Sequence, residues 1–243
     1  IMELAKINWN KEGYEEYFLY LSELAEEGYR EFHAKLIPGS SSRVLGVRVP
    51  QMRKLAKEIA KGDGRGFLDY CHTLDKESLS HEEISIIGLV TGCLKLPFGE
   101  LCERVRRFAA MVNNWAICDV CVSSFKEIKK YTEEYKIEIH RFLQSVNPWE
   151  QRVGIIVMLD FYLDSEENAR FALKQVNGVK SEEYYVQMAQ AWLIATALAK
   201  HRDVTIDFIK NEFALSDKVR KMTSRKIKDS YRVEAGDKDI MER

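Results

Sequence analysis

The amino-acid sequence predicts an all-α protein, specifically a right-handed α-solenoid of about six HEAT-like helix pairs with a concave groove. Three observations support this fold class. Apolar residues recur at spacings of three and four almost throughout the chain. The breaks between these runs are short, and helix pairs recur about every 35–40 residues. The 13 Gly and 4 Pro in 243 residues are few for a β fold rich in turns.

The helical periodicity can be followed in order along the chain. It is carried by Leu55, Ile59 and Leu68, then by Ile84, Ile87, Val90 and Leu94, then by Ile155, Ile156, Leu159 and Leu163, and finally by Met188, Trp192, Ala195 and Leu198. Breaks are expected at residues 37–42, 62–64, 96–99, 146–148 and 176–178.

Local signals mark where some of these helices begin. Ser80 followed by Glu83 matches a capping box, in which each side chain satisfies a backbone amide near the other residue. Pro148 suits the first turn of a helix, where no amide donor is needed. Ser181, which precedes Glu183 and an apolar run, indicates a further helix start.

Composition predicts a soluble, cytoplasmic protein. Hydrophobic residues make up 46% and charged residues 31% of the chain, as in ordinary globular proteins. No apolar run is long enough to span a membrane, and the N-terminus lacks a signal-peptide core. We expect residues 2–235 to form a single HEAT-like domain and residues 236–243 to form a polar C-terminal tail.

The 5 cysteines are odd in number and lie mostly in apolar helical runs, which indicates reduced, buried thiols. Cys118 and Cys121 have the C-x-x-C spacing, but a zinc site would need a second pair of ligands. No metal site is therefore predicted.

Trp115 and Asp119 are the most informative residues for function. Four residues apart on a helix, an indole and a carboxylate project from one face. An aromatic wall beside a carboxylate with few polar neighbours suits a site that stabilises a cation. The alternative is a buried Trp beside an Asp that caps a helix or pairs with a cation.

The formal net charge of −1 gives no support to nucleic-acid binding, but the charge is unevenly distributed. Residues 218–232 hold seven basic side chains against one acid. The first basic row along the chain lies near residues 48–57, and residues 218–232 form the second. The candidate DNA-binding residues are Arg48, Arg53, Lys54, Lys57, Arg220, Arg225, Lys226 and Lys228. Both rows could also be ordinary solvated helix faces.

Other chemistries have no support. None of the five histidines is paired with a Ser or Cys in a nucleophile motif, so acyl transfer is not indicated. The glycine-rich segment at residues 62–66 lacks the spacing of a phosphate-binding loop.

Four segments together resemble the DNA alkylation repair enzymes of AlkD type. They are LGVRVPQMRKLAK at residues 45–57, NWAICD at 114–119, WEQRVGII at 149–156 and YYVQMAQAWL at 184–193. No segment is specific alone, but their order and separations are similar to those of the family over about residues 10–235. The resemblance implies a HEAT-like α-solenoid, in agreement with the periodicity.

The resemblance also implies an activity. Members of the family excise cationic N-alkylated purines, such as 3-methyladenine and 7-methylguanine, from duplex DNA, and hold the damaged nucleotide against the concave surface without a base pocket. By motif matching, the catalytic positions are Trp115, Asp119, Arg152 and Trp192. Asp119 would stabilise the oxocarbenium ion, the two indoles would cradle the sugar, and Arg152 would anchor a phosphate or pair with Asp119. No cofactor and no obligatory protein partner are implied.

The sequence departs from the family pattern in one helix. Where the family's last Trp helix presents basic residues, this chain has Met188 and Ala195, which cannot contact phosphate. Related branches keep the fold without base excision. A non-catalytic module that binds nucleic acid or protein along its groove is therefore the alternative. A third reading is a scaffold whose groove holds a partner's helix, which would expose an apolar stripe there.

Overall fold

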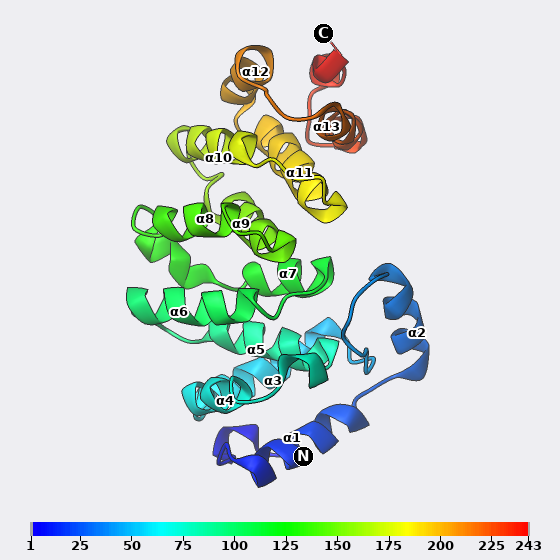
Figure 1. The fold of residues 1–243 in the computed structure, drawn as a ribbon, viewed down its shortest axis with the longest axis vertical. Coiled ribbons are helices and arrows are strands. Elements are labelled where there is room, and N and C mark those ends of the chain that lie inside the picture. The colour runs from blue at the N-terminus through cyan, green and yellow to red at the C-terminus, as the bar shows by residue number, and fades with distance from the viewer. Residues whose placement is uncertain (1, 243) are drawn as a thin grey trace. The chain divides into compact units, whose positions relative to one another are not determined.

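The computed structural model describes residues 2–242 and confirms an all-α protein, with no strand in that range (Figure 1). The first helices are α1 (Lys11–Glu23), α2 (Glu27–Leu36), α3 (Val49–Lys61), α4 (Gly64–Cys71), α5 (His81–Cys93), α6 (Phe98–Ala109) and α7 (Trp115–Val122). They are followed by α8 (Lys136–Leu143), α9 (Pro148–Phe161), α10 (Glu166–Gly178), α11 (Tyr184–Lys200), α12 (Arg202–Asn211) and α13 (Asp217–Asp229). The described residues also include five short 3-10 segments: η1 (Leu4–Lys6), η2 (Lys76–Ser78), η3 (Lys126–Tyr131), η4 (Ala235–Asp237) and η5 (Ile240–Glu242).

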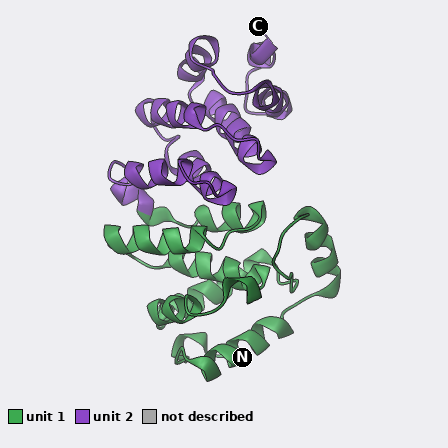
Figure 2. Ribbon diagram, in the orientation of Figure 1, with its two compact units in different colours: residues 1–127 green, residues 128–243 purple. Residues whose placement is uncertain are grey.

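The chain divides into two compact units, residues 1–127 and 128–243 (Figure 2). In the first unit, α5 packs between α3 and α7 and also contacts α4 and α6. In the second unit, α11 packs between α9 and α13 and also contacts α10 and α12. In each unit, a central helix therefore packs between helices that precede and follow it in the chain, as in stacks of helix pairs. The right-handed superhelix and the number of repeats remain predictions.

Helix α5 is the centre of the first unit. Its residues from His81 to Thr91 are all buried, so it is packed on every side. Gly88 allows α7 and α6 to approach closely, because a Cβ atom there would lie 2.6 Å from Cys121 Sγ and 2.5 Å from the Phe108 ring.

A buried carboxylate at the start of α5 holds the loop that leads into α3. Glu82 is fully buried and accepts hydrogen bonds from the backbone amides of Leu45 at 2.9 Å, Gly46 at 2.8 Å and Val47 at 3.2 Å. Gly46 has a φ of 103°, a conformation that favours glycine. Three amide donors replace the water that the buried carboxylate loses.

Two of the predicted helix starts are confirmed. Ser80 and Glu83 form the capping box at the start of α5, and Pro148 lies in the first turn of α9. The third is shifted, because α11 begins at Tyr184 after Glu183. The Ser181 hydroxyl accepts a hydrogen bond from the Glu183 amide, before the helix begins. Each predicted break lies at or beside an observed helix end. However, α4, α6 and α9 begin within the predicted breaks, at Gly64, Phe98 and Pro148, and the break at residues 176–178 is the last turn of α10.

The cysteines are all free, but only four are buried, since Cys93 at the end of α5 is exposed. The segment predicted as a polar tail, residues 236–243, is packed over its described part. Ile240 and Met241 are buried, and the buried carboxylate of Asp237 pairs with Arg202 at 2.6 Å. Within residues 2–242, no helix is both long and apolar enough to cross a membrane.

Candidate functional site

The candidate site in the first unit is the partly exposed face of α7. Asn114 caps this helix by accepting the Ile117 amide at 3.0 Å, so the helix starts with Trp115. Trp115 and Asp119 are both partly exposed, whereas Ile117 and Cys118 between them are buried. The indole and the carboxylate thus leave the core on one side of the helix, as their spacing predicts.

The Trp115 indole is fixed by a hydrogen bond. Its Nε1 donates to the backbone oxygen of Leu36, the last residue of α2, at 3.0 Å. The segment after α2 is attached to the same place, because Asn113 Nδ2 donates to Ser42 Oγ at 2.6 Å and Asn114 Nδ2 donates to Ser40 Oγ at 3.2 Å. These contacts determine where the indole lies beside Asp119.

Two buried histidines lie next to Asn114, the residue that caps α7. His33 Nε2 and His81 Nε2 are 3.1 Å apart, and His81 Nδ1 lies 3.3 Å from Asn114 Nδ2. Burial lowers the pKa of His33, and burial together with the adjacent His33 ring lowers the pKa of His81 to about 3. Both rings are therefore neutral at physiological pH and act as a polar packing contact between α2 and α5.

The first basic row lies on α3 and just before it. Arg53 is half-buried, and its Nη2 reaches the backbone oxygen of Val120 at 3.5 Å, next to Asp119 in the chain. Lys54 and Lys57 are exposed. Arg48 is held by two hydrogen bonds to Glu26 at 2.9 Å, which lower the pKa of that carboxyl.

In the second unit, Arg152 is only 5% exposed. Its Nη1 donates to the backbone oxygen of Tyr185, in the first turn of α11, at 2.5 Å. The guanidinium therefore ties α9 to the start of α11, and it has little surface with which to meet a phosphate. The expected role of Arg152, as a phosphate anchor or a partner of Asp119, stays a prediction.

Trp192 lies on α11 and is 38% exposed, so it is not a core residue. Ala195 is buried but lines the same cavity as the indole, and Lys226 Nζ from α13 lies 6.0 Å from the centroid of the Trp192 ring. The basic residue that the Met188 and Ala195 positions lack is thus supplied by a different helix.

The rest of the second basic row differs in its freedom to bind phosphate. Arg225 is exposed. Arg220 donates to the Met241 backbone oxygen at 3.1 Å and lies 4.5 Å from the Phe213 ring centroid. Lys228 pairs with Glu242, and with Asp239 at 3.5 Å. The C-terminal segment therefore neutralises part of the charge that the sequence shows between residues 218 and 232.

A family model for the DNA alkylation repair enzyme matches residues 15–232. The chain belongs to the DNA alkylation repair enzyme family. No curated protein is significantly similar to the chain. Membership places the protein in DNA repair, with an enzymatic role and DNA as its substrate.

The family match covers both candidate surfaces, the α7 face and the Trp192 cavity. Some of the segments that resemble the family have a structural use. In residues 45–57, the amides of Leu45, Gly46 and Val47 bind Glu82, whereas Lys54 and Lys57 remain exposed. The repair-family signature in this segment therefore combines a fold-determining turn with a basic helix face.

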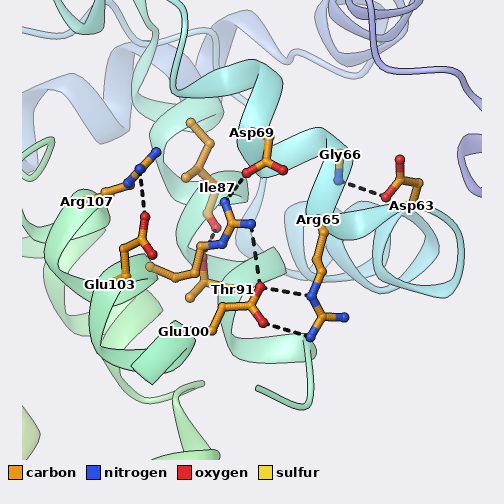
Figure 3. Close-up of polar contacts among 10 residues, drawn as sticks. Asp63, Arg65, Gly66, Asp69, Ile87, Thr91, Glu100, Glu103 and Arg107 are labelled. Atoms are coloured by element: carbon orange, nitrogen blue, oxygen red, sulfur yellow. Dashed lines mark hydrogen bonds and ion pairs between the residues drawn. The ribbon is translucent and has the colours of Figure 1, made fainter. Parts of the chain in front are cut away.

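Other basic residues of this repair-family protein are used within the fold. Asp69, Glu100 and Arg65 join a network with Arg104 on α4 and α6 (Figure 3). Arg65 binds both carboxylate oxygens of Glu100, at 2.9 and 3.0 Å, and Arg104, 8% exposed, lies 2.5 Å from Asp69. These guanidinium groups stabilise the packing of α4 and α6 and are not candidates for DNA contact.

Proposed function

We propose that this protein is a DNA N-glycosylase that excises positively charged N-alkylated purines, of the 3-methyladenine and 7-methylguanine type, from duplex DNA. The observation that carries the proposal is the pairing of Trp115 and Asp119 on the partly exposed face of α7. Membership of the DNA alkylation repair enzyme family supports it.

The protein does not have to protonate the damaged base, because this base is already a cationic leaving group. When the bond between C1′ and the purine nitrogen breaks, its electron pair neutralises the base and the sugar gains oxocarbenium character. A fixed carboxylate at Asp119 stabilises that positive charge, and a water oxygen then bonds to C1′ and releases a proton to solvent. One preorganised charge of this kind contributes about 3–4 kcal/mol.

The aromatic residues and the arginine have separate roles in the proposal. Trp115, held by its hydrogen bond to Leu36, presents its ring to the cationic nucleotide. Trp192 offers a second exposed indole from the second unit. Arg152 fixes the start of α11, and thus the helix that carries Trp192, with phosphate contact limited to its small exposed surface.

DNA affinity in this proposal comes from basic side chains that are at least partly exposed. Lys54 and Lys57 on α3 and Arg225 on α13 are exposed, and Arg53 and Lys226 are partly exposed. Lysine and arginine on such faces bind phosphates without reading sequence. Arg48, Arg220 and Lys228 have partners within the fold and are assigned a smaller share.

A nucleic-acid-binding module without chemistry is the second candidate function. The burial of Arg152 favours it, because the guanidinium is bonded to the Tyr185 backbone and has little exposed surface with which to hold a phosphate. Such a module would keep the basic faces and bind DNA without releasing a base.

Release of 7-methylguanine from methylated duplex DNA tests the proposal. Under single-turnover conditions, Asp119→Asn should lower the rate of release by about 10²-fold or more. Asp203→Asn is the matched control, since the Asp203 side chain is 91% exposed, and should keep the wild-type rate. If the wild-type protein binds methylated DNA but releases no base, the binding module is the correct function.

A further inference from the structure

The second unit contains a cavity of about 500 Å³ between α11 and the end of α13. Its volume is within the usual range for ligand sites, about 300–1,000 Å³. The α11 side is made by Trp192, Ala195, Thr196, Ala199 and Lys200, and the other side by Lys226, Asp229, Ser230, Tyr231 and Arg232.

Aromatic surface in this cavity is open to solvent. Trp192 is 38% exposed and Tyr231 is fully exposed. Ala195 and Ala199, both cavity-lining residues, are small and leave room beside the indole. A partly exposed indole beside small side chains suits a flat ring that stacks on it, and nucleic-acid bases stack on aromatic residues regardless of sequence.

The charges of the lining select an anionic ligand. Lys200, Lys226 and Arg232 are basic and Asp229 is the one acid among the lining residues, so three positive charges less one negative charge leave +2. Lys226 Nζ lies over the Trp192 ring, 6.0 Å from its centroid, which places a phosphate-binding group at the stacking surface. Asp229 can accept a hydrogen bond from an exocyclic amine of a base.

Basic side chains continue beyond the cavity. Lys221 and Arg225, further back on α13, are exposed and line a neighbouring hollow of about 400 Å³. A free nucleotide would use only the cavity, whereas a strand would place its next phosphates against this row. The continuity favours a strand as the ligand.

We propose that this cavity binds one unpaired nucleotide of a DNA strand, with its base stacked on Trp192 and its phosphate held by Lys226, Lys200 and Arg232. The nucleotide is unpaired because both faces of a base are covered inside a duplex. This binding requires no bond cleavage, although Trp192 and Lys226 also belong to the DNA-binding surface of the proposed function.

The test uses the full chain and an undamaged single-stranded oligothymidylate that carries one 2-aminopurine, whose fluorescence falls when the base stacks. The wild-type protein should quench this fluorescence. Trp192→Ala should abolish the quenching and weaken binding on the order of 5- to 100-fold, whereas Trp192→Phe should retain most of both. A melting curve for each variant checks that it is folded.

The charged side of the cavity is tested in the same assay. Lys226→Gln should weaken binding about 5- to 10-fold and reduce the slope of log affinity against log salt by about 0.7, the value for one phosphate of a single strand. Lys174→Gln, an exposed residue of α10, is the matched control and should change neither quantity.

Three results would overturn the proposal: no quenching by the wild-type protein, equal quenching by Trp192→Ala, or quenching of free 2-aminopurine nucleotide but not of the oligonucleotide. Because the DNA is undamaged, the outcome is independent of base excision. If the protein quenches the fluorescence but does not excise bases, this inference holds and the glycosylase proposal is wrong. If it excises bases but does not quench, the glycosylase proposal holds and this inference is wrong.

Discussion

The Nε2 atoms of His33 and His81 lie 3.1 Å apart in the interior of the first unit. One of the two nitrogens must accept a hydrogen bond from the other, so both rings cannot be protonated at Nε2 while this contact persists. The pair joins α2 to the start of α5 and lies against Asn114, which caps α7.

This pair predicts that the protein loses stability as the pH falls below 6.5. The native pKa values of both histidines are lowered from 6.5, to about 3 for His81. The unfolded chain then binds more protons than the native chain between those values, so stability is complete above pH 6.5 and declines as the pH is lowered. We expect the free energy of unfolding to fall by about 1–2 kcal/mol for His81 between pH 7.5 and 5.

Urea denaturation at several pH values measures this effect. His81→Gln should flatten the dependence, whereas His140→Gln, at an exposed position, should leave it as in the wild type. His72, whose pKa is lowered to about 4 mainly by burial, adds a second contribution that His72→Gln removes. An unchanged slope in the His81 variant would contradict the assignment.

The contacts of Glu82 predict that the conservative substitution Glu82→Gln will greatly lower the free energy of unfolding. In Glu82→Gln, one carboxylate oxygen becomes an amide donor that faces a backbone donor, and the three amides of residues 45–47 lose their charged acceptor. Each unsatisfied buried donor costs about 1–3 kcal/mol, so the loss should be about 3 kcal/mol or more. Glu77→Gln, at an exposed position, should change the urea midpoint little, and equal midpoints for the two variants would disprove the role of Glu82.

Gly88 and Gly99 predict opposite effects of the same substitution. A Cβ at Gly88 would lie 2.5 Å from the Phe108 ring, so Gly88→Ala should destabilise the protein by about 1–3 kcal/mol. Gly99 lies in the first turn of α6 with no atom within 4 Å of the added Cβ. Gly99→Ala should therefore leave stability equal or raise it by up to about 1 kcal/mol. Thermal melting compares the two variants. A lower melting temperature in Gly88→Ala alone would indicate close helix packing at Gly88, whereas equal losses would indicate a general effect of alanine.

The all-α class was predictable because helical spacing, capping residues and break residues are all local in the sequence. Ser80 and Glu83 show this, since they are three residues apart and form the predicted capping box. Glu82 was missed because its partners are backbone amides at residues 45–47, which carry no sequence signal. The histidine pair was missed for a similar reason, since its members are 48 residues apart.

The candidate site was predictable only in part. The spacing of Trp115 and Asp119 determined that they share a face of α7, and both are partly exposed. Helix α11 is apolar all round, so periodicity could not show that Trp192 faces solvent rather than the core. The apolar residues after Arg152 were the available signal for its burial, whereas motif matching assigned it only a role, as a phosphate anchor or a partner of Asp119.

The polar network on α4 and α6 predicts unequal effects of two arginine substitutions. Arg104 is 8% exposed and contacts Asp69 and Glu100, whereas Arg107 pairs with Glu103 at an exposed position. Arg104→Ala should cost about 2–3 kcal/mol, because hydrogen bonds to charged groups are lost from a buried site. Arg107→Ala should cost at most about 1 kcal/mol. Urea denaturation compares them, and equal losses would show that burial is not what makes the Arg104 contacts strong.

The exposed lysines of α3 predict how binding to duplex DNA depends on salt. Lys54 and Lys57 are exposed on the same helix as Arg53, whose guanidinium reaches Val120 beside Asp119. If each lysine contacts one phosphate, the double variant Lys54→Gln/Lys57→Gln should reduce the slope of log affinity against log salt by about 2 and weaken binding most at low salt. Fluorescence anisotropy with a labelled duplex measures both quantities. Arg107→Gln on α6 removes one positive charge from a residue that is already paired with Glu103 and should leave the slope as in the wild type. A slope that does not change in the double variant would move the DNA-binding surface away from α3.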